Sequence, residues 1–150
     1  MVDLERFAIS GLFGPLLPGT PYPVVNDMFG ELELDWPTNK RAPLFVKYGD
    51  IEFMFRFHRL TTAACNLVEG RPVDAGRLPV QGFWPEPRRT RAAVADLLAQ
   101  NGVTWELDVR ASSMTPEESS QVWVTENHVH LAFFQGTLQS FLADYGPILP

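Results

Sequence analysis

The sequence predicts an α+β fold, a two-layer sandwich in which helices cover one face of an antiparallel sheet. The main observation is that the apolar pattern of residues 51–63 recurs in residues 129–141, at a constant offset of 78 positions that places Leu131 at the position of Phe53. A helical pattern also precedes the strands of each half. An isolated helix and an isolated small meander are both marginal in water, so packing the helices on one shared sheet would stabilise both.

The length and composition are those of one globular domain. The chain has 150 residues, of which 45% are hydrophobic and 20% are charged. We therefore expect a single domain over residues 1–150. Its first helix-β-meander repeat would cover about 3–68, a connecting loop 69–89, and its second repeat about 90–145.

The first half begins with a predicted helix over residues 3–13. Asp3 can cap its first turn, and Gly14-Pro15 ends it. Residues 15–30 are rich in proline and glycine and are expected to form an ordered loop. The alternating residues 31–36 predict a short edge strand.

Strands dominate the rest of both halves. Gly49-Asp50 has the chemistry of a two-residue hairpin turn. Thr90 can cap a helix over Arg91–Asn101, which Gly102 ends. Periodicity leaves the final segment ambiguous between helix and strand, and the 78-residue offset assigns it as a strand. The predicted strands are Leu44–Tyr48, Ile51–Phe57, Leu60–Val68, Val103–Arg110, Gln121–Thr125, His128–Phe134 and Thr137–Tyr145.

The predicted core lies between the helices and the sheet. The connecting loop contains Phe83 and Trp84, which are too apolar for a solvated linker and are expected to pack down. Alternation along the strands and the stripe of the second helix predict a shared core. Its expected members are Phe53, Phe55, Leu97, Leu98, Leu131 and Phe133.

Four segments of the chain form a recognisable pattern: Phe13-Gly14-Pro15, Lys47-Tyr48-Gly49-Asp50-Ile51-Glu52-Phe53, Arg59-Leu60 and Gly136-Thr137-Leu138-Gln139-Ser140-Phe141. In these segments the chain resembles uncharacterised bacterial proteins with a KYGDIEF-like motif, which look like immunity proteins of toxin systems. The resemblance covers nearly the whole chain and implies a function by binding.

The predicted helix-plus-meander repeat is also similar to the tandem-repeat fold of the β-lactamase inhibitor protein and of small outer-membrane assembly lipoproteins. The lipobox of those lipoproteins is missing here, and the disulfides of the inhibitor are impossible with one cysteine. The resemblance therefore implies a fold and a binding role, without a specific partner.

Charge and cysteine content limit the partners and the compartment. A formal net charge of −6 argues against a nucleic-acid partner and would suit a basic protein, although it is also ordinary for a soluble protein. A single cysteine, Cys65, indicates a reducing compartment. We expect a cytoplasmic protein without a membrane partner, because no window approaches a membrane span and the N-terminus lacks a basic signal region.

Several residues could carry chemistry, but each has an ordinary structural interpretation. His128 and His130 lie two positions apart on a predicted strand, so both would point to one face and could bind a metal, yet no motif supplies a third ligand. Cys65 could be a nucleophile, but a buried thiol among small residues is the simpler interpretation. The carboxylates of Asp50 and Glu52, or of Glu106 and Asp108, could pair as acid and base, or could lie on a solvated sheet face.

Three arginines cluster before the second predicted helix, and they could hold an anion or form a solvated helix start. They are Arg88, Arg89 and Arg91. We expect no cofactor, no metal and no catalytic residues.

The best candidate site is the sheet face that the helices would leave open. Aromatic residues and methionine among charges are typical of a protein interface. Alternation places on this face Glu52, Met54, Arg56, Glu106, Asp108, Trp123, His130 and Phe134. From these we expect a protein to contact Glu52, Met54, Arg56, Trp123, His130 and Phe134. Alternatively, the loop of residues 79–87 could cover this face.

We therefore expect a non-enzymatic protein-binding module, an immunity-type protein that neutralises a bacterial toxin. The alternative is a small enzyme or ligand carrier with an apolar pocket between the helices and the sheet, which convergent polar groups in such a pocket would favour.

Overall fold

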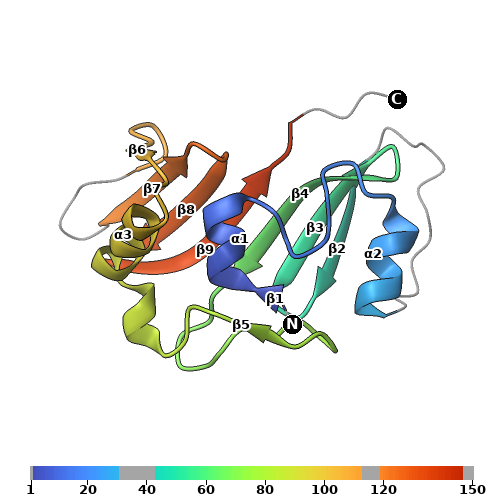
Figure 1. Ribbon diagram of the computed structural model, residues 1–150, viewed down its shortest axis with the longest axis horizontal. Coiled ribbons are helices and arrows are strands. Elements are labelled where there is room, and N and C mark those ends of the chain that lie inside the picture. Colours follow the sequence, from blue (N-terminus) through green and yellow to red (C-terminus); the bar gives the residue numbers. More distant parts are fainter. Residues whose placement is uncertain (1, 31–42, 113–118, 147–150) are drawn as a thin grey trace.

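A computed structural model describes residues 2–30, 43–112 and 119–146. Over these residues the chain forms an α+β sandwich with a seven-stranded antiparallel sheet in the order β2-β3-β4-β9-β8-β7-β6 (Figure 1). The strands are β2 (Leu44–Tyr48), β3 (Ile51–Arg56), β4 (Arg59–Asn66), β6 (Trp105–Leu107), β7 (Ser120–Thr125), β8 (Val129–Phe134) and β9 (Thr137–Asp144). The predicted edge strand over residues 31–36 lies outside the described residues.

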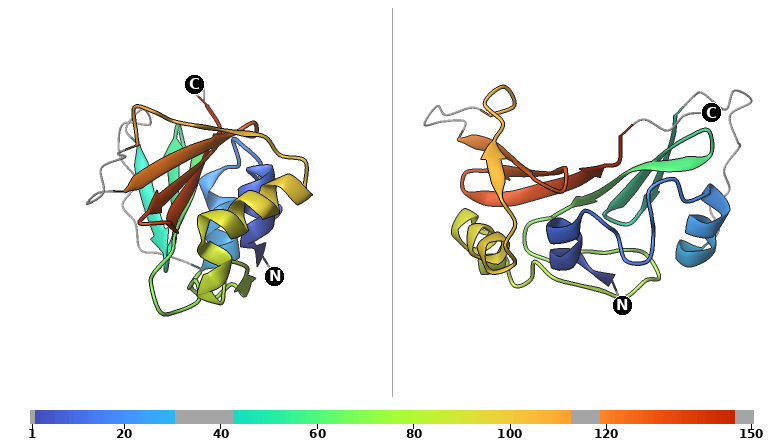
Figure 2. Two further views of the ribbon diagram at one scale, coloured as in Figure 1. Left: turned by 90° about the vertical axis from the view of Figure 1, so that its left-hand side faces the viewer. Right: turned by 45° about the horizontal axis from the view of Figure 1, so that its top comes forward.

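The helices cover one face of this sheet (Figures 1 and 2). They are α1 (Leu4–Ser10), α2 (Tyr22–Phe29), α3 (Arg91–Gln100) and the 3-10 helix η1 (Glu86–Arg89). A short parallel pair, β1 (Val2–Asp3) with β5 (Val80–Gln81), lies on the same side. None of the described helices is long and apolar enough to cross a membrane.

Local sequence signals explain where two helices begin. The Asp3 carboxylate accepts hydrogen bonds from the first-turn N–H groups of α1, and the Thr90 hydroxyl accepts from Ala93 N in α3. The sequence did not predict α2, because Pro21 and Pro23 indicate a loop. Both prolines lie at the start of α2, where a missing N–H group costs no helical hydrogen bond.

Two hairpins of the sheet repeat at the predicted offset. In β3–β4, Ile51 pairs with Cys65, and in β8–β9 the residues 78 positions later, Val129 and Ala143, pair in the same way. The register shifts at equivalent places, after Met54 and after Ala132. Full helix-plus-meander repeats stay a prediction, since α1 and α3 begin 87 positions apart (91 − 4).

The remaining strand of each meander, β2 in the first half and β7 in the second, follows a different offset. Val46 of β2 pairs with Phe53, whereas Trp123 of β7 pairs with Leu131, so the two strands correspond at 77 positions. The reason is the turn, because residues 126–128 separate β7 from β8, one residue more than Gly49-Asp50 places between β2 and β3.

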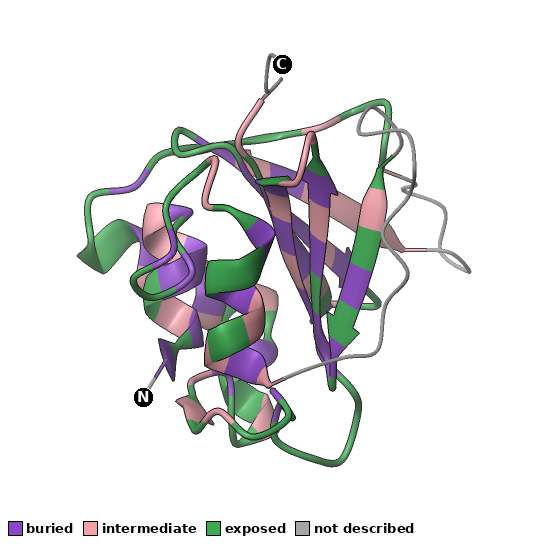
Figure 3. Cartoon of the chain, turned by 90° about the vertical axis from the view of Figure 1, so that its right-hand side faces the viewer, coloured by how far each residue is buried: buried purple, intermediate pink, exposed green. Residues whose placement is uncertain are grey.

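The core between the layers consists largely of aromatic rings. Phe7 of α1 lies 5.0 Å from Phe141, and Phe13 and Phe29 lie 5.5 and 5.2 Å from Phe53, all between ring centroids. Burial alternates along the strands (Figure 3). Of the predicted core, Phe53, Phe55, Leu98, Leu131 and Phe133 are buried and Leu97 is partly buried.

Candidate functional site

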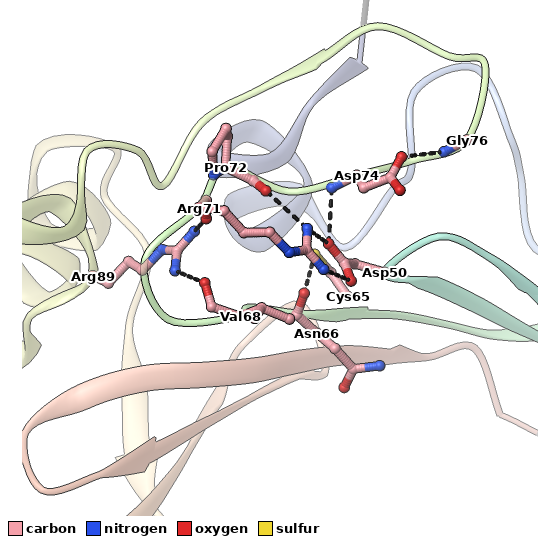
Figure 4. Close-up of polar contacts among 9 residues, drawn as sticks. All are labelled: Asp50, Cys65, Asn66, Val68, Arg71, Pro72, Asp74, Gly76 and Arg89. Carbon is pink, nitrogen blue, oxygen red and sulfur yellow. Dashed lines mark hydrogen bonds and ion pairs between the residues drawn. The ribbon is translucent and has the colours of Figure 1, made fainter.

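A polar cluster holds the β2–β3 turn against the connecting loop (Figure 4). The Asp50 carboxylate accepts hydrogen bonds from both terminal nitrogens of Arg71, at 2.7 and 2.8 Å, and from Asp74 N at 2.8 Å. Asp50 N in turn donates to Asp74 O at 2.6 Å. We call Asp50, Arg71 and Asp74 the turn clasp.

Gly49 makes the turn clasp possible. Its φ angle is +61°, and a Cβ atom at this position would lie 2.4 Å from the carbonyl oxygen of Asp74. Glycine therefore supplies both the left-handed backbone and the space for the loop to approach. Packing against the connecting loop is enough to explain the Gly49-Asp50 motif.

Arg89 is buried beside the turn clasp and holds three carbonyl groups. Its Nε donates to Phe83 O, and its terminal nitrogens donate to Val68 O and Arg71 O. The neighbouring Arg88 pairs with Glu5 of α1. Two roles were predicted for this arginine cluster, an anion site and a solvated helix start. Neither describes Arg89, which holds three backbone carbonyl groups in and beside the connecting loop.

Cys65 lies in the core next to this cluster. Burial raises the pKa of its thiol to about 12, so the thiolate needed for nucleophilic attack is scarce at neutral pH. The turn clasp and its surroundings thus combine a paired carboxylate, a protonated thiol and a guanidinium bound to three carbonyl groups. This arrangement stabilises the loop and offers no activated nucleophile among the residues named.

Most residues of the predicted binding face lie where alternation placed them. Glu52 and Arg56 are exposed, Met54 and His130 are partly buried, and Phe134 is 38% exposed. Glu52 accepts a hydrogen bond from Asn66 across the neighbouring strand. This side of the sheet is opposite the helices, and we call it the outer face.

Trp123 is the exception, and its predicted place on the outer face is wrong. Its side chain is 4% exposed and packs 4.4 Å from Phe133 on the helical side. The longer turn before β8 shifts β7 by one position relative to β2, which reverses the face. Alternation could not reveal this, because Val122, Trp123 and Val124 are all apolar.

Two further predictions for this region need correction. Asp108 and His128 lie outside the strands: the Asp108 carboxylate accepts from Arg110 N and Ala111 N, and His128 has a φ of +60° in the turn. Since His128 lies in the turn before β8, it is outside the strand that would point it to the same face as His130. Among the described residues no three His, Cys, Asp or Glu side chains come together as a potential metal site.

The connecting loop does not cover the outer face. Its Phe83 is fully buried and lies 5.4 Å from Phe141, whose side chain points to the helical side. This confirms that Phe83 packs on the core. It also means that the alternative of a loop over the outer face does not hold for residues 79–87.

Grooves bring some of the predicted residues together at one end of the sheet. Met54 and Arg56 line a groove of about 420 Å³, and His130 lines another of about 590 Å³. Asp144 and Gly146 line both grooves, so the two adjoin along the end of β9. We call this end of the outer face the rim.

Phe134 belongs to a different place. It borders a groove of about 540 Å³ that includes Arg89 and Glu86, away from the rim. The sequence did not identify Asp144 as a member of the rim. Its only signal was its position at the end of a strand that the repeat itself defined.

The chain was compared with models of protein families, with curated proteins and with solved structures, and no match was found in any of the three.

Proposed function

We propose that the protein is a binding module of the immunity type, which neutralises a bacterial toxin by occupying part of its surface. The binding site would be the outer face, centred on the rim formed by Met54, Arg56, His130 and Asp144. The resemblance of the KYGDIEF segment to immunity-type proteins suggested this class, and the argument below rests on the described residues.

One observation carries the proposal. The described helices and the connecting loop all pack on the same side of the sheet, which leaves the outer face open on the described part of the chain (Figure 2). Open positions combine apolar side chains, such as Met54 and Phe134, with charged ones, such as Arg56 and Glu52. That mixture suits an interface with an apolar centre and a polar rim.

The sheet is also a rigid platform. Hydrogen-bonded neighbours hold β3, β4, β9 and β8 on both sides, so binding here would order little backbone. Small ordering costs leave more of the contact energy as affinity. The net charge of −6 would favour fast encounter with a basic partner.

Capture followed by titration tests the proposal. The protein is used as bait in extracts of bacteria that secrete toxins, the captured protein is purified, and its affinity is measured by calorimetry. The double variant Met54→Ala/Arg56→Ala should weaken binding by at least about 2 kcal/mol if either side chain is a hot spot. The matched control is Arg6→Ala/Val24→Ala, a pair of exposed residues on α1 and α2.

Equal losses in the rim variant and the control would contradict the proposal. The protein could instead turn over a small molecule, and a single substitution at a carboxylate or at Cys65 could abolish that turnover. This result would replace the proposed binding function with an enzymatic one.

A further inference from the structure

Strand β6 forms one edge of the sheet and pairs with β7 on one side only among the described residues. Asp108 N donates to Val122 O and Glu126 N donates to Thr104 O, so residues 104 and 108 direct their hydrogen bonds toward β7. Trp105 and Leu107 alternate with these positions. Antiparallel geometry therefore turns the N–H and C=O groups of both residues away from β7, toward the open edge.

The side chains of the same two residues form an exposed apolar strip. Trp105 and Leu107 are each 38% exposed, although both face the helical side. The Trp105 ring stacks on Trp123 at 3.9 Å with an interplanar angle of 10°, so a buried residue holds it in place. An edge with free backbone groups and a fixed apolar strip is a template for another strand.

Acidic residues flank β6 along its length. Glu126 accepts from Thr104 N just before the strand, Glu106 is exposed within it, and Asp108 follows directly after it. The charge is uneven along the chain: residues 90–150 contain seven Asp or Glu and two Lys or Arg, against 11 and 10 in residues 1–89. The opposite edge of the sheet, β2, carries Lys47 instead.

We propose that β6 binds an extended basic segment of a partner protein, which adds to the sheet as an eighth strand. Main-chain hydrogen bonds to Trp105 and Leu107 would supply affinity, as in other cases of strand addition. Apolar side chains of the added strand would lie beside Trp105 and Leu107, and Lys or Arg at alternate positions would lie beside Glu106. This edge adjoins the groove of about 590 Å³ at the rim through Glu126, but the inference does not depend on the function proposed above.

A defined peptide tests this site. The probe is a ten-residue peptide in which lysine alternates with valine, titrated into the full-length ¹⁵N-labelled protein and followed by amide chemical shifts. The largest shifts should occur at Trp105 and Leu107, and binding should weaken as salt is added. A peptide in which glutamate alternates with valine should not bind.

Two variants separate the backbone contribution from the charge contribution. Leu107→Pro removes one outward N–H group while leaving the hydrogen bonds to β7, and should weaken peptide binding about tenfold, with Leu107→Thr as the control that keeps this group. Glu106→Lys should weaken binding about tenfold as well. Its control is Asp27→Lys, an exposed position on α2, which should leave binding unchanged. If Leu107→Pro does not fold, the Glu106 pair decides.

Three results would overturn the proposal. The first is a set of shifts centred on β2 or on the rim. The second is equal binding of the lysine and glutamate peptides. The third is concentration-dependent dimerisation of the protein alone that Leu107→Pro abolishes, which would assign the edge to a second copy of the chain.

Discussion

The two equivalent hairpin turns of the sheet have different surroundings. Gly49-Asp50, between β2 and β3, is enclosed by the connecting loop, and Asp50 is only 6% exposed. Residues 126–128, between β7 and β8, are exposed and line the groove of about 590 Å³ at the rim. In the second turn, the Asn127 side chain donates to Ile9 O of α1, which attaches it to the helical layer by one side chain.

This difference separates the structural role of the first turn from the binding role proposed for the rim beside the second. The first turn uses its charged group internally, since Arg71 and Asp74 donate three hydrogen bonds to the Asp50 carboxylate. The second turn leaves Glu126 and His128 at the surface beside Asp144. The Gly49-Asp50 motif therefore serves stability, and the proposed binding site lies beside the equivalent turn in the other half.

The largest expected effect concerns what the two halves share. Phe53→Ala and Leu131→Ala empty equivalent buried positions of β3 and β8, and each should lower the free energy of unfolding by about 3–5 kcal/mol. Urea titration of both variants measures this. A loss below about 1 kcal/mol in either variant would show that the corresponding strand face is not part of the core.

The next effect tests the enclosure of the first turn by the connecting loop. Gly49→Ala should cost about 2–4 kcal/mol, because an alanine there is strained at positive φ and displaces Asp74 from the turn. The control is Gly102→Ala, which has a similar φ of +68° with nothing within 4 Å of the added Cβ, and should cost about 1 kcal/mol. Similar losses in urea titrations of both variants would mean that the close approach of Asp74 contributes nothing.

The smallest effect concerns the charge in the turn clasp. Hydrogen bonds from Arg71 lower the pKa of Asp50 in the folded protein. The ionised carboxylate therefore stabilises the fold at pH values above the ordinary pKa of an aspartate. Asp50→Asn should therefore cost about 1.5–3 kcal/mol at pH 7, the usual range for hydrogen bonds to charged groups. The difference from the native protein should shrink as the pH falls below about 4 and the folded-state carboxylate is protonated. Urea titrations between pH 3 and about 7 follow this change, and a pH-independent difference would contradict it.

The sequence predicted the strands well because their patterns are local. Alternation from Ile51 to Arg56 and the offset to Val129–Phe134 were enough to place both hairpins and to assign β9 as a strand. Two failures have physical causes. The prolines at the start of α2 looked like a loop, and apolar side chains on both faces of β7 hid the true orientation of Trp123.

The site was harder to predict than the fold because its contacts are distant in sequence. Asp50 binds Arg71, 21 positions later, and no periodic pattern identifies that pair. The rim joins Met54 and Arg56 to Asp144 through the pairing of β4 with β9, which only the folded sheet provides. Alternation did identify Met54, Arg56 and His130 as outward-facing, and this was the part of the site available to sequence reasoning.

Affinity for a captured partner, compared between the rim and the turn clasp, tests the central claim most directly. In calorimetric titrations at pH 7, Met54→Ala/Arg56→Ala should weaken binding by about 30-fold, equivalent to about 2 kcal/mol. Asp50→Asn, measured at a temperature where it remains folded, should leave affinity within about twofold, because a buried carboxylate does not reach a partner. Unchanged affinity in the rim variant, together with a large loss in Asp50→Asn, would contradict the claim and move the binding site to the first turn.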